Sequence, residues 1–219
     1  MSTSTRPRDE FVEANDLRFH YREWGDPRTR HAVVLLHGYA ETSEVWTETA
    51  QDLAREFRVI AIDQRGRGQS DRATDRDYTR ASQMEDLEAI IESLGLRSVT
   101  LIGHSMGGAN AICYAAEHPE MVSALVVIET APEVLRSGIE TIRRLLATGS
   151  SFNSLEDAIE AFREFFPYAT TEQIERRVRA SLTVNDDGSW SYDECTTYEV
   201  KSKGMTVDHT DRNTLRKVG

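Results

Sequence analysis

The pentapeptide Gly103-His104-Ser105-Met106-Gly107 constrains the fold more than any other feature of this chain. An apolar run at 99–102 precedes it, and a stretch typical of a helix, residues 108–116, follows it. A serine between two glycines at a strand-to-helix junction is typical of a sharp, strained turn that exposes the serine hydroxyl. Ser105 is therefore a candidate nucleophile, because a nearby base can activate such a hydroxyl. The alternative is a tight turn whose hydroxyl has no chemical role.

The front half of the chain alternates predicted strands with predicted helices. Residues 17–21 alternate apolar and polar side chains like a half-buried antiparallel strand, and apolar residues recur at helical spacing over 43–57 and 84–94. Continuous apolar runs, typical of strands covered on both faces, occur at residues 32–36, 59–62, 99–102 and 125–128. These successive strand–helix units predict an α/β fold with a mostly parallel, doubly wound sheet.

The chain has 219 residues, which suffice for one sizeable core with a small insertion. The alternation of strands and helices ends near residue 131. From there to residue 184 the pattern is helical only, around residues 134–147, 154–166 and 171–183. We therefore predict three parts, namely a core over 1–130, a helical lid over 131–184 and an irregular C-terminal tail over 185–219.

Charge and composition exclude several classes of partner. The net charge of -11 disfavours nucleic acid and anionic membranes. No apolar run approaches the ~20 residues of a membrane span, and the N-terminus lacks the apolar core of a signal peptide, so we expect a cytoplasmic protein. Cys113 and Cys195 belong to no metal-binding pattern. We expect a small-molecule substrate, no cofactor and no metal.

Three motifs give the chain a resemblance to the α/β-hydrolase family, and the matching elements cover about residues 15–185. His37-Gly38-Tyr39 ends one predicted strand, residues 63–71 follow the next, and the pentapeptide around Ser105 is the third. The resemblance implies that Ser105 attacks a carbonyl carbon. It also implies that the backbone N–H groups of Tyr39 and Met106 form an oxyanion hole.

The five histidines upstream of residue 130 are interpreted as residues without a catalytic role. The resemblance implies that His37 and His104 are structural residues and not general bases. We interpret the remaining histidines upstream of residue 130 as ordinary surface or loop residues: His20, His31 and His118.

The family pattern requires an acid and then a histidine after the nucleophile. His209 is the candidate base, and Glu129, at the end of the strand after that of Ser105, is the candidate acid. After residue 184 no run of four to six apolar residues supplies the two strands that normally precede these groups. All three lysines, Lys201, Lys203 and Lys217, fall in the last 19 residues, as does His209. We interpret this pattern as a C-terminal truncation of a longer hydrolase that lacks its closing strands.

The predicted function is hydrolysis of carboxylic esters, or of related thioesters, lactones or amides, through an acyl-enzyme on Ser105. A serine argues against dehalogenase and epoxide-hydrolase chemistry, for which the family uses Asp at this position. One alternative is a truncated, catalytically inactive fragment or binding-only pseudoenzyme. Another is a cofactor-free haloperoxidase or perhydrolase activity, because it uses the same triad.

Overall fold

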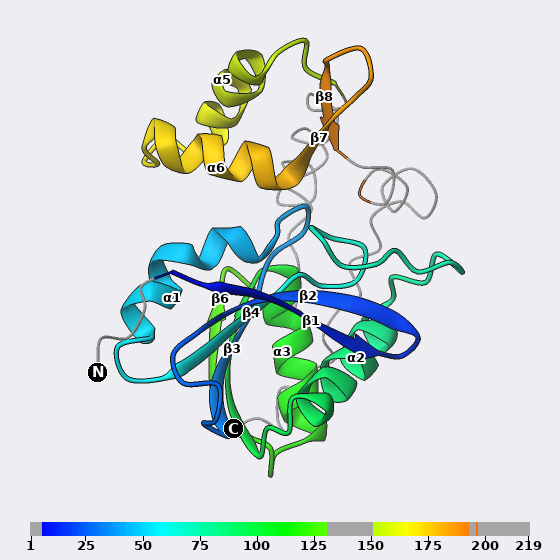
Figure 1. The fold of residues 1–219 in the computed structure, drawn as a ribbon, viewed down its shortest axis with the longest axis vertical. Coiled ribbons are helices and arrows are strands. Elements are labelled where there is room, and N and C mark those ends of the chain that lie inside the picture. Colours follow the sequence, from blue (N-terminus) through cyan, green and yellow to red (C-terminus); the bar gives the residue numbers. More distant parts are fainter. Residues whose placement is uncertain (1–5, 131–150, 193–195, 197–219) are drawn as a thin grey trace. The chain divides into compact units, whose positions relative to one another are not determined.

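The computed structural model describes residues 6–130, residues 151–192 and Thr196, and these residues belong to two compact units (Figure 1). The described part of the first unit contains a large sheet with its helices, and that of the second contains two helices with a small hairpin. Each unit is described by itself. The predicted helix at 134–147 and the candidate base His209 lie outside the described residues.

The first unit is built on a six-stranded sheet with the order β1-β2-β4-β3-β5-β6. The pairs β3–β4, β3–β5 and β5–β6 are parallel, whereas β1–β2 and β2–β4 are antiparallel. The predicted mostly parallel α/β sheet is therefore confirmed. The strands are β1 (Arg8–Ala14), β2 (Leu17–Trp24), β3 (His31–Leu36), β4 (Arg58–Ile62), β5 (Ser98–His104) and β6 (Val122–Ile128).

Helices cover both faces of this sheet, as a doubly wound architecture requires. Helices α2 (Arg80–Ser93) and α3 (Met106–Glu117) lie on one face (Figure 1). The short 3-10 helix η1 (Ser43–Trp46) and α1 (Thr47–Leu53) lie on the other. Side chains of β3 alternate between two cores: Ala32, Val34 and Leu36 pack with α2 and α3, and Val33 and Leu35 pack with η1 and α1. This alternation explains the continuous apolar runs, because both faces of the central strands are buried.

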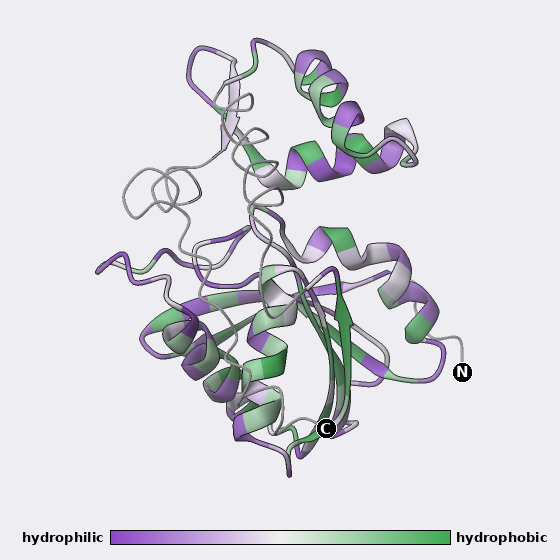
Figure 2. Cartoon of the chain, turned by 180° about the vertical axis from the view of Figure 1, so that it is seen from behind, coloured by the Kyte–Doolittle hydropathy of each residue, from purple (hydrophilic) through white to green (hydrophobic). Residues whose placement is uncertain are grey.

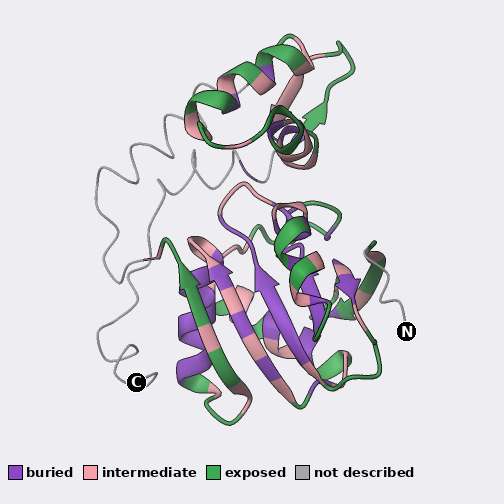
Figure 3. Cartoon of the chain, turned by 90° about the vertical axis from the view of Figure 1, so that its left-hand side faces the viewer, coloured by how far each residue is buried: buried purple, intermediate pink, exposed green. Residues whose placement is uncertain are grey.

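Strand β6 is the exposed edge of the described sheet. Val126 is 44% exposed, Val127 37% and Ile128 39%, so residues on both sides of the pleat contact solvent. Figure 2 shows the hydrophobic character of this strand, and Figure 3 shows its exposure beside the buried central strands. An apolar strand edge of this kind is a surface to which another strand can add.

The second unit corrects part of the sequence analysis. Helices α5 (Leu155–Phe165) and α6 (Thr171–Ser181) match two predicted helices. However, residues 182–184 and 190–192 are strands, contrary to the expectation of helices alone up to 184 and of irregular structure from 185. Strands β7 (Leu182–Val184) and β8 (Trp190–Tyr192) pair as an antiparallel hairpin. Strands of three residues are too short to display a recognisable alternation of apolar and polar residues.

His20 also differs from its predicted surface position, because its side chain is only 2% exposed. Its Nδ1 lies 2.7 Å from Oδ2 of Asp63, and its Nε2 lies 3.1 Å from Oδ1 of Asp9. Burial by itself would lower the pKa of His20, but the hydrogen bonds to Asp63 and Asp9 hold this pKa above its usual value. A ring that donates to a carboxylate from each nitrogen is an imidazolium. It ties the β1–β2 hairpin to the loop after β4.

This ion pair predicts a pH dependence of stability. A group whose pKa is raised by folding stabilises the fold fully below its unfolded pKa, about 6.5 for histidine. That contribution is lost as the pH rises through the folded pKa. Urea denaturation from about pH 6 to about pH 9 should therefore show the free energy of unfolding falling more for the parent than for His20→Gln.

The matched control is His31→Gln, because His31 is partly buried and its Nδ1 contacts the hydroxyl of Ser98, 3.1 Å away, and not a carboxylate. This variant controls for the loss of a histidine side chain that has no carboxylate partner among the described residues. Equal slopes in the parent and in His20→Gln would contradict the imidazolium assignment.

Candidate active site

Ser105 lies in the turn between β5 and α3, with strained backbone angles of φ +48° and ψ -113°. Such a conformation costs a non-glycine residue about 1–3 kcal/mol and persists only where the surrounding structure holds it. Here the N–H of Ser105 donates to the carbonyl of Ile128 over 2.9 Å. The hydroxyl of Thr130 donates to the carbonyl of Ser105 over 2.7 Å. The end of β6 therefore anchors the turn.

The glycines of the pentapeptide are required by close backbone packing. A Cβ on Gly103 would lie 2.4 Å from the carbonyl oxygen of Gly107. A Cβ on Gly107 would lie 2.4 Å from the carbonyl oxygen of Leu36, at the end of β3. Real Cβ atoms essentially never come this close to backbone atoms, so the start of α3 contacts β5 and β3 only if both positions lack a side chain.

The two expected oxyanion donors follow adjacent strands, Tyr39 in the loop after β3 and Met106 at the start of α3. Leu36 of β3 is paired with Gly103 of β5, so Tyr39 and Met106 both follow shortly after paired positions. The segment 38–41 is a turn closed by the N–H of Glu41, which donates to the carbonyl of Gly38 over 3.3 Å. That bond does not use the N–H of Tyr39. Met106 opens α3, where the first N–H groups have no acceptor within the helix and carry its positive dipole end.

His104 lies between two carboxylates. Its Nδ1 is 2.9 Å from Oε2 of Glu41, and its Nε2 is 3.1 Å from Oε2 of Glu129. The same oxygen of Glu41 accepts the N–H of Gly38 over 2.9 Å. The hydrogen bond to Glu41 is the main reason why the pKa of His104 lies above its usual value. The structure therefore places Glu129, the candidate acid, beside the nucleophile turn and in contact with His104.

His37 is fully buried and holds two loops together. Its Nδ1 lies 2.8 Å from the carbonyl oxygen of Gly38, and the N–H of Gln64 donates to its Nε2 over 3.0 Å. A carbonyl only accepts and an N–H only donates, so the ring is neutral with its proton on Nδ1. Burial lowers the pKa of His37, which favours the same neutral form. Both nitrogens are thus engaged with the protein backbone.

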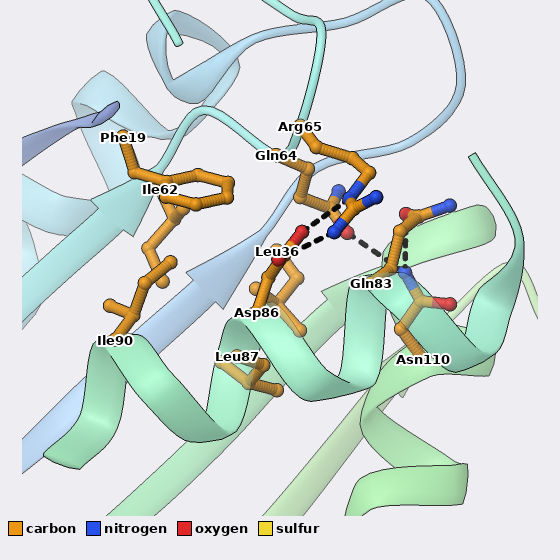
Figure 4. Close-up of a pocket in the computed structure, with 10 residues that line it drawn as sticks. All are labelled: Phe19, Leu36, Ile62, Gln64, Arg65, Gln83, Asp86, Leu87, Ile90 and Asn110. Atoms are coloured by element: carbon orange, nitrogen blue, oxygen red, sulfur yellow. Dashed lines mark hydrogen bonds and ion pairs between the residues drawn. The ribbon is translucent and has the colours of Figure 1, made fainter. Parts of the chain in front are cut away.

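A polar network joins the loop 63–71 to α2 and α3 (Figure 4). The amide of Asn110 donates to Oε1 of Gln64 over 2.9 Å and to Oε1 of Gln83 over 2.8 Å. Arg65 forms a bidentate ion pair with Asp86 on α2. The cavity lined by these residues measures about 10 Å³, roughly the space that one water molecule occupies. It is too small for a substrate.

The structure thus brings four of the five predicted site residues to the carboxyl edge of the sheet: Ser105, Tyr39, Met106 and Glu129. The fifth, His209, lies outside the described residues. The sequence analysis missed Glu41, whose only sequence signal is its place four residues after His37. Among the described residues, no group of three or more His, Cys, Asp or Glu side chains could hold a metal ion. Likewise, none of the described helices is long and apolar enough to span a membrane.

The close packing at the turn predicts a large cost for Gly103→Ala. The added methyl group would overlap backbone atoms, which cannot rotate away, so the variant should lose about 3 kcal/mol or more in free energy of unfolding, measured by urea denaturation. Gly95→Ala is the control, because Gly95 has φ +62° and the nearest atom is the flexible guanidinium of Arg30. This variant should lose only about 1–2 kcal/mol. Equal losses would contradict the steric explanation.

Comparisons with known proteins agree with this geometry. The family model for the alpha/beta hydrolase fold matches residues 31–185. Epoxide hydrolase 4 of Mus musculus is 37% identical over 118 residues, which cover 53% of this chain and 33% of that protein. A Bacillus subtilis (strain 168) protein, provisionally named 2-succinyl-6-hydroxy-2,4-cyclohexadiene-1-carboxylate synthase, is 36% identical over 169 residues. These residues cover 73% of this chain and 61% of the relative.

A solved structure is similar over nearly the whole chain. The crystal structure of an alpha/beta hydrolase from Novosphingobium aromaticivorans DSM 12444 has a TM-score of 0.83 and 26% sequence identity. The match covers 97% of this chain and 78% of that one. By contrast, the chain spans 33% of the length of the mouse relative and 61% of that of the Bacillus relative. The matches of family model, sequence and structure lead to one conclusion: the chain belongs to the α/β hydrolase fold family.

Proposed function

We propose that this chain is a serine hydrolase of carboxylic esters, or of related thioesters, lactones or amides, acting through an acyl-enzyme on Ser105. The observation that carries the proposal is the strained backbone of Ser105, φ +48° and ψ -113°, at the N-terminus of α3. Strain of this kind is typical of functional positions. The positive end of the helix dipole also favours negative charge that develops beside Ser105.

The proposed reaction has two steps. In the first, the hydroxyl of Ser105 attacks the carbonyl carbon and passes its proton to a base, while the N–H groups of Tyr39 and Met106 donate to the oxyanion. Collapse of this intermediate expels the alcohol, which takes the proton from the base. In the second, water cleaves the acyl-enzyme and restores Ser105. Removing one oxyanion donor typically costs about 2.7–4 kcal/mol of barrier lowering.

Glu129 and His209 complete the proposal as acid and base. Ile128, which precedes Glu129, is paired with His104 across β5 and β6, so Glu129 begins next to the nucleophile turn. Its carboxylate contacts His104 through Oε2. The other oxygen, Oε1, is the one that we assign to the imidazole of the base. The role of His209 rests on the order nucleophile, acid and histidine along the chain.

The chemistry of the nucleophile favours esters over epoxides, although one relative is named for epoxide hydrolysis. Attack on an epoxide by a serine hydroxyl would form an ether, which water does not cleave under mild conditions. Attack by a carboxylate forms an ester, which water does cleave. Ser105 can therefore turn over a carbonyl substrate but not an epoxide. The Bacillus relative is named as a synthase, so the relatives do not share one named reaction.

A binding-only or inactive role is the second candidate, and the exposed edge of β6 favours it. Val126, Val127 and Ile128 leave an apolar strand edge directly beside the nucleophile turn. A sheet that needs another strand at this edge would have an incompletely supported site. Turnover distinguishes this candidate from the hydrolase.

A fluorescent fluorophosphonate tests the proposed nucleophile, because it reacts with activated serines. The parent should be labelled, and Ser105→Ala should not be. Ser123→Ala, which removes an exposed serine of β6, should be labelled like the parent. Hydrolysis of a short p-nitrophenyl ester should fall by about 10⁴- to 10⁶-fold in Ser105→Ala. A folded parent that resists labelling would contradict the hydrolase and support the inactive role.

Two further variants test the acid and the base. Glu129→Gln and His209→Gln should each lower the kcat for this ester by about 100-fold or more, because the base transfers the proton and the acid holds the imidazole in its reactive orientation. Glu120→Gln is the control, since it removes a carboxylate from the loop before β6, at the opposite end of the strand. A parental kcat in His209→Gln would exclude His209 as the base.

A further inference from the structure

We propose that His104 is a positioning residue that, as an imidazolium, bridges Glu41 and Glu129 and holds the oxyanion loop, residues 38–41, against the nucleophile turn. This role deepens the serine hydrolase function proposed above and rests on it. His104 itself touches no reacting atom in this proposal. It acts through the loop that carries the N–H of Tyr39.

The hydrogen bonds require the charged form of the ring. Carboxylates accept hydrogen bonds and do not donate them when ionised. Each ring nitrogen of His104 lies within 3.1 Å of a carboxylate oxygen, so both nitrogens must carry a proton for both bonds to form. A neutral imidazole has one N–H and satisfies only one of the two. Loss of one proton therefore releases either Glu41 or Glu129.

The bond to Glu41 reaches the backbone of the oxyanion loop directly. One oxygen, Oε2 of Glu41, accepts from both His104 and the N–H of Gly38. The loop also touches the ring, since a Cβ on Gly38 would lie 2.7 Å from Nδ1 of His104. An oxyanion donor must lie about 2.7–3.1 Å from the developing charge. Displacement of this loop therefore weakens the donor at Tyr39.

Backbone strain surrounds the same ring. Ala40, Ser105 and Glu129 have φ values of +57°, +48° and +51°, and they belong to the loops after β3, β5 and β6. Non-glycine residues keep such angles only where neighbouring contacts hold them. His104 is the side chain that links the loop after β5 to both of the others. The His104 side chain therefore holds three strained loops together.

The charges predict the direction of the pH effect. Among the described residues, the charged groups that face His104 are Glu41, from the loop after β3, and Glu129, from the loop after β6. With the imidazolium present, the cluster carries one net negative charge, and without the proton it carries two. The second negative charge and the released loop both oppose an oxyanion. Acylation should therefore slow as the pH rises through the pKa of His104, whereas a general base would give the opposite dependence.

Nuclear magnetic resonance of the full chain with ¹⁵N-labelled histidine tests the bridge without requiring activity. Below its pKa, His104 should carry protons on both nitrogens, and its pKa should exceed about 6.5. Glu41→Gln should lower this pKa. The ¹⁵N signals of His31, which begins β3 at the other end of the sheet, should be the same in the parent and in Glu41→Gln at the same pH. A pKa of His104 at or below about 6.5, or one unaffected by Glu41→Gln, would overturn the bridge.

Fluorophosphonate labelling rates test the positioning role. His104→Ala should slow labelling by about 10- to 100-fold, the effect of a misplaced catalytic group. His104→Gln offers two N–H donors on one nitrogen and does not titrate, so it should restore most of the rate and lose the fall at high pH. His31→Gln should match the parent in rate and pH profile. Circular dichroism at each pH confirms that the compared samples are folded.

The outcomes separate this proposal from the proposed function. A labelled parent with His104→Ala at the parental rate overturns the positioning role and leaves the hydrolase intact. Labelling that rises with pH through the pKa of His104, and is abolished in both His104 variants, makes His104 the base and also overturns the positioning role. If the NMR experiment confirms the His104 bridge but the parent is never labelled, the hydrolase function is overturned. The proposed role of His104 in positioning the oxyanion loop is then overturned as well.

Discussion

The close contact between the start of α3 and the ends of β3 and β5 is the constraint on which the rest of the site depends. Gly103 and Gly107 allow backbone atoms to meet where a side chain would overlap them. This packing makes the chain turn sharply at Ser105, and the turn sets the positive φ of that residue. The helix N-terminus and the serine hydroxyl are thereby brought to the same point at the carboxyl edge of the sheet.

Buried charged pairs hold the loops around this edge. Asp63 binds His20 and also accepts the N–H of Ser43 over 2.6 Å, so it joins three segments of the chain. Arg65 and Asp86 attach the same loop to α2. Removing one partner of a buried pair typically costs about 3–5 kcal/mol, because the other charge is left without a partner. The polar loops near the site are therefore part of the fold and not an addition to its surface.

Local sequence patterns predicted most of the first unit and the two described helices of the second unit, but not its hairpin. The central strands were recognisable because burial on both faces requires continuous apolar runs, as at 32–36 and 59–62. Strand β1 was missed, since Asp9, Glu10 and Glu13 are charged and exposed and interrupt any apolar run. The hairpin of β7 and β8 was missed because three residues are too few to show an alternation of apolar and polar side chains. His20 was misplaced because its burial depends on Asp63, which lies 43 positions away.

The sequence by itself determined the sharp turn at Ser105, the parallel sheet beneath it and the position of the expected oxyanion donors. The turn and the sheet follow from short-range rules, namely the absence of a Cβ and the period of apolar residues, whereas the donor positions follow from the resemblance to the hydrolase family. Only the tertiary structure decided the surroundings of His104. Its partners Glu41 and Glu129 lie 63 and 25 positions away in the chain. Parallel pairing of β3, β5 and β6 brings these residues together, because it places the carboxyl ends of distant strands side by side.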